Sequence, residues 1–336
     1  MILFRRLALA AVLLAFVVVV LGAWVRLSDA GLGCPDWPGC YGHLTVPSAP
    51  EHVENANAAY PERPLEAHKA WKEMIHRYCA GVLGLLVLAL ALLAWRRRGE
   101  PGQPLALPLA LLALVVFQAL LGMWTVTLQL KPLVVMAHLL GGLATLALLW
   151  WLNLGQQRWL PSAPADAGLR PWALLAFAAV VGQIALGGWT SANYAALACV
   201  DFPTCQAQWW PQMDFREAFV LWRGLGINYE YGVLEHPARV AIHVSHRLGA
   251  LVVLLLVGWL AWRALRRGAT PQVRRLGLVL ALALALQLLL GVSNVLFALP
   301  LPVAVAHNGG AALLVLTLVT LNHILRARSE PCAPRP

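Results

Sequence analysis

The hydrophobic pattern divides the chain into long apolar runs separated by polar connections. Eight runs have about the 20 residues that an α-helix needs to cross the hydrocarbon core of a bilayer. They cover approximately residues 7–26, 74–95, 105–127, 133–152, 172–192, 240–262, 274–296 and 302–323. Two connections, about 27–73 and 193–239, are long, and the others are short. The pattern therefore predicts an all-α, polytopic membrane protein with eight transmembrane helices.

The first apolar run follows Arg5 and Arg6 and could be taken for a signal peptide with these residues as its basic start. Its apolar stretch is long, however, and no convincing cleavage site of small residues follows it. We therefore interpret it as a span that stays in the protein.

The composition supports a membrane protein and excludes two other classes. Hydrophobic residues make up 60% of the 336 residues and charged residues only 12%, whereas about a quarter of a soluble domain is charged. So few charges do not cover the surface of a soluble globule of this length, which excludes a soluble enzyme. Such a hydrophobic chain is also unlike a disordered protein.

The positive charge follows the predicted topology. If the N-terminus is cytoplasmic, the cytoplasmic segments hold 15 of the 25 basic residues and three acidic ones, and ten basic and twelve acidic residues remain outside. The net charge of +10 thus divides into +12 inside and −2 outside, as the positive-inside rule requires, and needs no nucleic-acid partner. We predict a multi-pass protein of a bacterial plasma membrane with both termini cytoplasmic. The cytoplasmic basic residues are Arg5, Arg6, Arg96, Arg97, Arg98, Arg158, Arg170, Arg263, Arg266, Arg267, Arg274, Arg275, Arg326, Arg328 and Arg335; the acids are Glu100, Asp166 and Glu330.

The two halves of the chain repeat each other at offsets of 165 and then 169 to 170 residues. Both halves begin inside and contain four spans, so the repeat is parallel. It predicts two pseudo-symmetric four-helix bundles, residues 1–160 and 161–336. The matching segments are 21–24 (LGAW) with 186–189 (LGGW), the C-x5-C pairs, His76-Arg77 with His246-Arg247, 118–122 (QALLG) with 287–291 (QLLLG), and Ala137-His138 with Ala306-His307.

Four of the ten histidines lie within spans: His76, His138, His246 and His307. An ionisable residue in the bilayer is costly and indicates function, although a single one could serve only as a helix–helix hydrogen bond. Each half contributes one histidine from its second helix and one from its fourth, at similar depth near the outer leaflet. Two facing imidazoles suit the axial positions of a haem iron, whereas zinc or copper prefers three or four donors. The pattern therefore predicts one bis-histidine haem in each half.

Arg77 and Arg247 directly follow the histidines of the second and sixth spans. We predict that their guanidinium groups pair with haem propionates at the outer face. The alternative is that each arginine extends to the lipid headgroups.

The halves differ three residues before these histidines, where Glu73 in one half corresponds to His243 in the other. Residues three apart share a helix face, so Glu73 and His243 are each predicted to point into the haem pocket of their own half. A carboxylate there could stabilise a developing cation or move protons, and an imidazole could donate a hydrogen bond or relay protons. The alternative is that Glu73 is only an acid of the first helical turn. The difference predicts one reacting site and one site that supplies electrons.

The outer loops carry two C-x5-C pairs, Cys34/Cys40 and Cys199/Cys205. Disulfides persist in that compartment, and the first pair is embedded in turn-forming residues that could bring the sulfurs together. We interpret Cys199/Cys205 as a structural link, and for Cys34/Cys40 a redox role is an equal alternative.

Other polar residues in the spans have simpler interpretations. Gln118, Gln183 and Gln287 are expected to form helix–helix hydrogen bonds. Cys79 in the second span and Cys332 in the tail have no partner in the pattern and are assigned to packing.

The combination of these motifs resembles the haem A synthase family over about residues 10–325. The matching residues are 31–38 (GLGCPDWP), Glu73-x-x-His76-Arg77, His138, His246-Arg247 and His307. The resemblance implies eight spans in two bundles and oxidation of the C8 methyl of haem O to a formyl group, giving haem A for terminal oxidases. It also implies partners: haem O as substrate with haem O synthase as its supplier, an electron donor, and a second copy of the chain in a homo-oligomer.

The resemblance also implies residue roles. His246 and His307 would ligate a haem B cofactor, with His243 and Arg247 beside it. His76 and His138 would mark the site where haem O is oxidised, with Glu73 important to turnover, and Cys34/Cys40 and Cys199/Cys205 would match the family's loop cysteine pairs. The alternative function is a bis-histidine dihaem electron carrier of the cytochrome b type, which would use the same four histidines but not Glu73.

Overall fold

The computed structural model describes residues 2–156 and 163–326. Within these ranges it is helical, and eight of its helices are long and apolar enough to cross a membrane, which confirms the predicted all-α, eight-span fold. The basic residues Arg158, Arg328 and Arg335, together with Glu330 and Cys332, lie outside the described residues. The long helices are α1 (Ile2–Leu27), α3 (Ala67–Arg96), α4 (Ala106–Thr127), α5 (Pro132–Gly155), α6 (Arg170–Ala192), α8 (His236–Arg267), α9 (Pro271–Leu296) and α10 (Leu301–Ile324).

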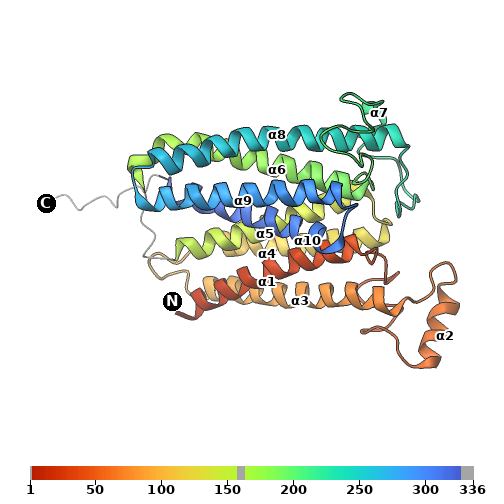
Figure 1. Cartoon of the computed structure of the whole chain (residues 1–336). Helices are drawn as coiled ribbons and strands as arrows, with labels where there is room; N and C mark the ends of the chain where they lie inside the picture. The colour runs from red at the N-terminus through yellow and green to blue at the C-terminus, as the bar shows by residue number, and fades with distance from the viewer. Residues whose placement is uncertain (1, 157–162, 327–336) are drawn as a thin grey trace.

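The outer connections contain two short helices that the hydrophobic pattern does not predict, α2 (Pro50–Ala59) and α7 (Phe215–Ala218). In α7 the carboxylate of Asp214 accepts a hydrogen bond from the backbone N–H of Glu217, which caps the helix. Both short helices lie at one end of the molecule, opposite the end where α1 begins (Figure 1). A 3₁₀ helix, η1 (Pro164–Leu169), leads into α6 at the other end.

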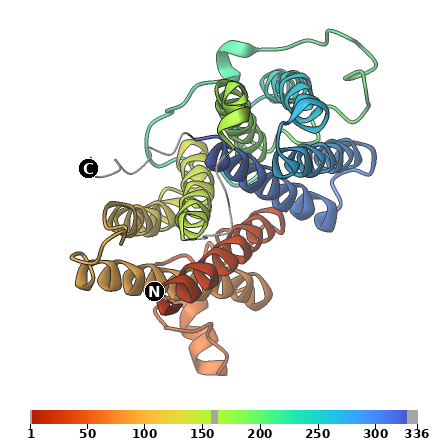
Figure 2. The ribbon, with the colours of Figure 1, turned by 90° about the vertical axis from the view of Figure 1, so that its left-hand side faces the viewer.

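The helices form two adjoining rings of four. In the first half, α1 packs against α3 and α5, and α4 packs against the same two; in the second half, α6 and α9 each pack against both α8 and α10. The rings meet where α10 packs against α1 and α5, and where α5 packs against α6. Figure 2 shows the first-half helices (red to yellow-green) beside those of the second half (green to blue). The boundary of the predicted division into residues 1–160 and 161–336 lies outside the described residues, and the division stays a prediction.

The repeat extends to the backbone of the loops. Left-handed φ angles occur at Asp29 and Tyr194, which are 165 residues apart, and at Tyr41 and Gln206, with the same separation. The turn between α4 and α5 has such angles at residues 129 and 130, and the turn between α9 and α10 has them 169 residues later, at 298 and 299. Because non-glycine residues rarely adopt this conformation, these matches indicate that the halves share their turns as well as their helices.

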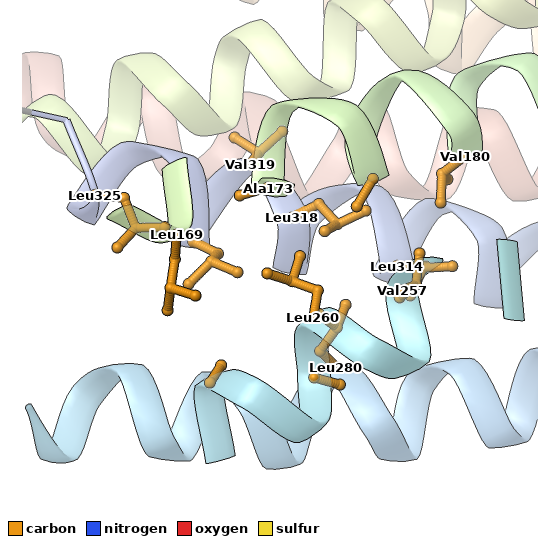
Figure 3. Close-up of a cluster of buried hydrophobic side chains, with 14 of the residues drawn as sticks. Leu169, Ala173, Val180, Val257, Leu260, Leu280, Leu314, Leu318, Val319 and Leu325 are labelled. Carbon is orange, nitrogen blue, oxygen red and sulfur yellow. The ribbon is translucent and has the colours of Figure 1, made fainter. Parts of the chain in front are cut away.

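Apolar side chains of α6, α8, α9 and α10 form a core in the second half, part of which Figure 3 shows. Lipid tails are as apolar as these side chains, so close packing contributes more to association than burial does. At Gly277, α9 approaches the backbone of α8 closely: a Cβ atom there would lie 2.6 Å from the nitrogen of Leu265 and 2.9 Å from the oxygen of Ala261. Glycine thus sets the distance between these two helices.

We predict that Gly277→Ala destabilises the protein by about 1–3 kcal/mol, because the helices must separate to accept the methyl group. Thermal unfolding in detergent measures the effect. Gly182→Ala is the matched control, since a Cβ atom at Gly182 in α6 would contact nothing within 4 Å. Equal melting temperatures for the two variants would contradict this interpretation of the α8–α9 contact.

Candidate functional site

The four membrane histidines lie on helices at opposite corners of the two rings. His76 is in α3 and His138 in α5, and both α1 and α4 separate these helices; His246 in α8 and His307 in α10 are related in the same way. The two imidazoles of each pair are close enough across the ring to interact electrostatically. The four histidines are six to ten residues from the outer ends of their helices, or about 9–15 Å along the axis at 1.5 Å per residue. The structure therefore places one pair inside each half at similar depth.

Each imidazole packs against a glycine of a neighbouring helix. The Cε1 atom of His76 lies 3.1 Å from the position that a Cβ atom would take at Gly22, and the rings of the other three histidines meet Gly122, Gly187 and Gly291 at 3.1–3.4 Å. A larger residue at these glycines would push the ring aside. The glycines thus fix the position of the imidazoles.

The donor set suits haem iron. The Nδ1 atoms of His76, His138 and His307 are buried and make no well-formed hydrogen bond to the residues that the structure describes. Within that same part of the chain, no three His, Cys, Asp or Glu side chains gather as a metal ion would require. Each ring of helices thus offers two imidazoles that approach from opposite corners.

Glu73 is a buried carboxylate, with an exposed fraction of 4%, one turn before His76. Its Oε2 accepts a hydrogen bond from the backbone N–H of Cys34 at 2.9 Å, and its Oε1 accepts one from Nη2 of Arg77 at 2.5 Å. The helix begins at Ala67, so Glu73 is past the first turn and the interpretation as a first-turn acid is wrong. The carboxylate instead joins the helix of His76 to the first cysteine loop.

The equivalent residue in the second half makes a different contact. His243 is also buried, and its Nδ1 lies 2.9 Å from the carbonyl oxygen of Ala195. Glu73 thus accepts from a backbone N–H and pairs with an arginine, whereas His243 faces a backbone carbonyl. The two pockets therefore differ in hydrogen-bond partners as well as in residue type.

Arg77 and Arg247 hold the cysteine loops. Nη1 of Arg77 donates to the carbonyl oxygens of Asp36 at 3.0 Å and Gly39 at 2.5 Å. Arg247 donates to the carbonyl oxygens of Asp201 and Thr204, both at 2.7 Å. The sequence did not predict this role, although the arginine and the C-x5-C loop occur together in both halves of the chain, which was a signal for it. The predicted pairing with propionates stays a prediction.

The two cysteine loops have the same construction. Disulfides join Cys34 to Cys40 and Cys199 to Cys205, each with 4.8 Å between the Cα atoms. In the first loop the Asp36 carboxylate accepts from the backbone N–H groups of residues 41 and 42, and in the second Asp201 accepts from those of residues 206 and 207. The hydroxyl of Thr204 and these N–H groups lower the pKa of Asp201.

The second outer loop also covers part of the first half. Arg63 forms an ion pair with Glu230 at 3.0 Å and donates to the carbonyl oxygen of Leu32 at 3.1 Å. Lys131, at the start of α5, is buried: its ammonium group lies over the ring of Trp222 and donates to the carbonyl oxygen of Gly224. These contacts, which the sequence did not predict, connect the outer loops of the two halves.

We predict that Arg77→Lys loosens the first cysteine loop, since a single ammonium group does not reproduce the planar fork of arginine. The Cys34–Cys40 disulfide should then be reduced by dithiothreitol about tenfold faster, as expected for the loss of about one to two net hydrogen bonds. Labelling of the released thiols measures the rate. Arg97→Lys at the other end of α3 serves as the control, and an unchanged rate for Arg77→Lys would show that the arginine does not hold the loop.

Comparisons with known proteins identify the family of this chain. The model of the COX15-CtaA family, described as cytochrome oxidase assembly protein, matches residues 5–319. A protein named "Heme A synthase" from Shewanella oneidensis is 48% identical over 93% of this chain and 94% of its own length.

More distant relatives carry the same name. One from Caulobacter vibrioides is 28% identical over 90% of each chain, and one from Halalkalibacterium halodurans is 27% identical over 92% of each. The family model and the first relative both extend over nearly the whole chain, including both histidine pairs and both cysteine loops. This chain therefore belongs to the COX15-CtaA family of cytochrome oxidase assembly proteins.

Proposed function

We propose that this chain is a haem A synthase, an oxidoreductase that converts the C8 methyl of haem O to a formyl group. The names of its relatives support the activity. The observation that supports the assignment of the two halves is Glu73, a buried carboxylate beside His76 whose counterpart in the second half is an imidazole, His243. We therefore place haem O between His76 and His138 in residues 1–160, and the resident cofactor in residues 161–336.

The second pair, His246 and His307, would hold haem B as the cofactor. Two imidazoles at opposite corners, each set against a glycine, fit the axial ligation of a haem. Haem B would supply one-electron transfer there. His243 and Arg247 lie one turn before and directly after His246, where they would adjust the surroundings of the group.

Glu73 has the position and the partners for a role in the oxidation. Each of two successive two-electron oxidations would use O₂ and two electrons from an external donor to replace one C–H bond of the methyl group with C–OH, while the second oxygen atom leaves as water. The geminal diol then loses water to form the aldehyde, and protons are transferred at each stage. A carboxylate can accept these protons or stabilise positive charge that develops on the substrate. The N–H of Cys34 and the guanidinium group of Arg77 hold the carboxylate in place.

The same hydrogen bond connects the site to the Cys34–Cys40 disulfide. Because Cys34 donates to Glu73 directly, we propose that this pair couples the site to an external reductant or assists haem transfer. Cys199–Cys205 then serves as the structural counterpart. The long loops, which carry both disulfides, lie at one end of the molecule (Figure 1). We place this end outside a bacterial plasma membrane and both termini in the cytoplasm. Haem O synthase as the supplier of substrate and a homo-oligomer stay predictions.

A dihaem electron carrier of the cytochrome b type is the competing function. It would need the four histidines but would give no purpose to a buried, hydrogen-bonded Glu73. Extraction and chromatography of the haems from purified protein separate the two. Haem B together with haem O or haem A supports the synthase, and haem B alone at two per chain supports the carrier.

We predict that Glu73→Gln lowers haem A formation about 100-fold or more, the usual effect of losing an acid–base group. Haem O or a hydroxylated intermediate should accumulate while haem B is retained, as chromatography of the extracted haems will show. Glu62→Gln is the matched control, because Glu62 is an exposed outer-loop acid. Normal amounts of haem A from Glu73→Gln would refute the assigned role.

A further inference from the structure

Three of the four histidines share an additional pair of residues. In each case a glutamine lies four residues before the glycine that packs against the imidazole. A second glycine lies three residues after the histidine. The side-chain amide of each glutamine lies so close to the second glycine that a Cβ atom at that glycine would overlap the amide. The three Gln/Gly pairs are Gln118/Gly141 beside His138, Gln183/Gly249 beside His246, and Gln287/Gly310 beside His307.

The pair is absent beside His76. Valine stands at position 18, four residues before Gly22, and Cys79 follows His76 by three residues. Val18 has no polar side chain, and Cys79 has the Cβ atom that the glutamine amide excludes elsewhere. Both members of the pair therefore change together, which indicates that glutamine and glycine act as one structural unit.

Two of the three glutamine amides reach an imidazole, whereas Nε2 of Gln118 is buried without a hydrogen-bond partner among the described residues. Nε2 of Gln183 lies 3.0 Å from Nδ1 of His246 and donates to the carbonyl oxygen of the same residue at 2.9 Å. Nε2 of Gln287 lies 3.4 Å from Nε2 of His307. The backbone carbonyl of Val18 approaches His76, as those of Gln118 and Gln287 approach His138 and His307, but residue 18 supplies no side-chain amide.

A ligand imidazole needs such a neighbour. When one ring nitrogen binds a metal, the other carries a proton, and the group that accepts it fixes the ring. The Oε1 atoms of Gln183 and Gln287 are buried and have no partner among the described residues. Rotation of the amide exchanges its donor and acceptor, so each glutamine can accept the proton of its histidine.

We propose that Gln118, Gln183 and Gln287 are positioning residues for His138, His246 and His307, and that His76 is the exchangeable ligand. The proposal deepens the proposed function and rests on its assignment of one haem to each half. It gives the cofactor site two fixed ligands, as a resident group requires. The substrate site has one fixed and one exchangeable ligand, as release of a product requires.

Exchange of the Gln/Gly and Val/Cys pairs between the two sites tests this proposal. Carbon monoxide is titrated into the reduced, purified holoprotein, and the loss of the six-coordinate spectrum of each haem is followed by absorption. In the unaltered protein, carbon monoxide should bind to the haem of the first half. Gln183→Val with Gly249→Cys should increase its affinity for the second haem about fivefold to tenfold, the effect of about one net hydrogen bond.

The reverse exchange, Val18→Gln with Cys79→Gly, should lower the affinity for the first haem by a similar factor. Gln156→Val at the inner end of α5 is the control and should change neither. Because the two exchanges act in opposite directions, a general loss of folding does not imitate the expected pair of results. Gln183→Glu keeps an acceptor oxygen and should behave like the unaltered protein.

Unchanged affinities in both exchange variants, with both haems retained, would overturn the proposal. That result leaves the proposed activity standing if the variants still make haem A. Conversely, the expected shifts in a protein that never makes haem A would support the positioning role and reject the synthase activity. The two proposals therefore fail separately.

Discussion

The structure depends on the need to hold imidazoles inside an apolar helix bundle. An ionisable side chain in the bilayer is costly unless it is paired or bound, and a ligand must also have a fixed direction. Here each histidine ring rests against a glycine of the adjacent helix, which allows the backbone and the ring to approach closely. The helices that carry the histidines, α3 and α5 in one half and α8 and α10 in the other, stand at opposite corners of their rings. The four-helix ring is thus the simplest scaffold that brings two such imidazoles face to face.

The two halves share this scaffold and differ in a few side chains. Both have the arginine that holds a disulfide loop and the aspartate that closes the loop. They differ where Glu73 corresponds to His243, and where Val18 and Cys79 correspond to Gln183 and Gly249. The first difference adds a buried carboxylate to one site, and the second removes a hydrogen-bonding neighbour from one ligand. A duplicated bundle can thus supply one reacting site and one electron-transfer site without a change of fold.

The sequence predicted the features that depend on periodicity and composition. The eight spans follow from apolar length, and the structure has all of them. The histidine pairs follow from the repeat, and their role as haem ligands stays a prediction. It did not predict α2 and α7, because short polar helices leave no apolar period, nor the contacts of Arg77, because these end on loop carbonyls whose positions depend on the fold. The glutamines were interpreted only as helix contacts, since their closeness to the histidines becomes visible when the helices are packed. The sequence also singled out Glu73, whose role in turnover stays a prediction, but its bond to Cys34 required the folded loop.

The central claim, that each half holds its own haem between two histidines, is tested most directly by a haem inventory of paired variants. Haems are extracted from purified His76→Ala/His138→Ala and His246→Ala/His307→Ala proteins and identified by chromatography. Loss of haem O and haem A from the first variant with haem B retained, and loss of haem B from the second, is the predicted result. Equal loss of all haems from both variants, with the helical content of each intact, would contradict it.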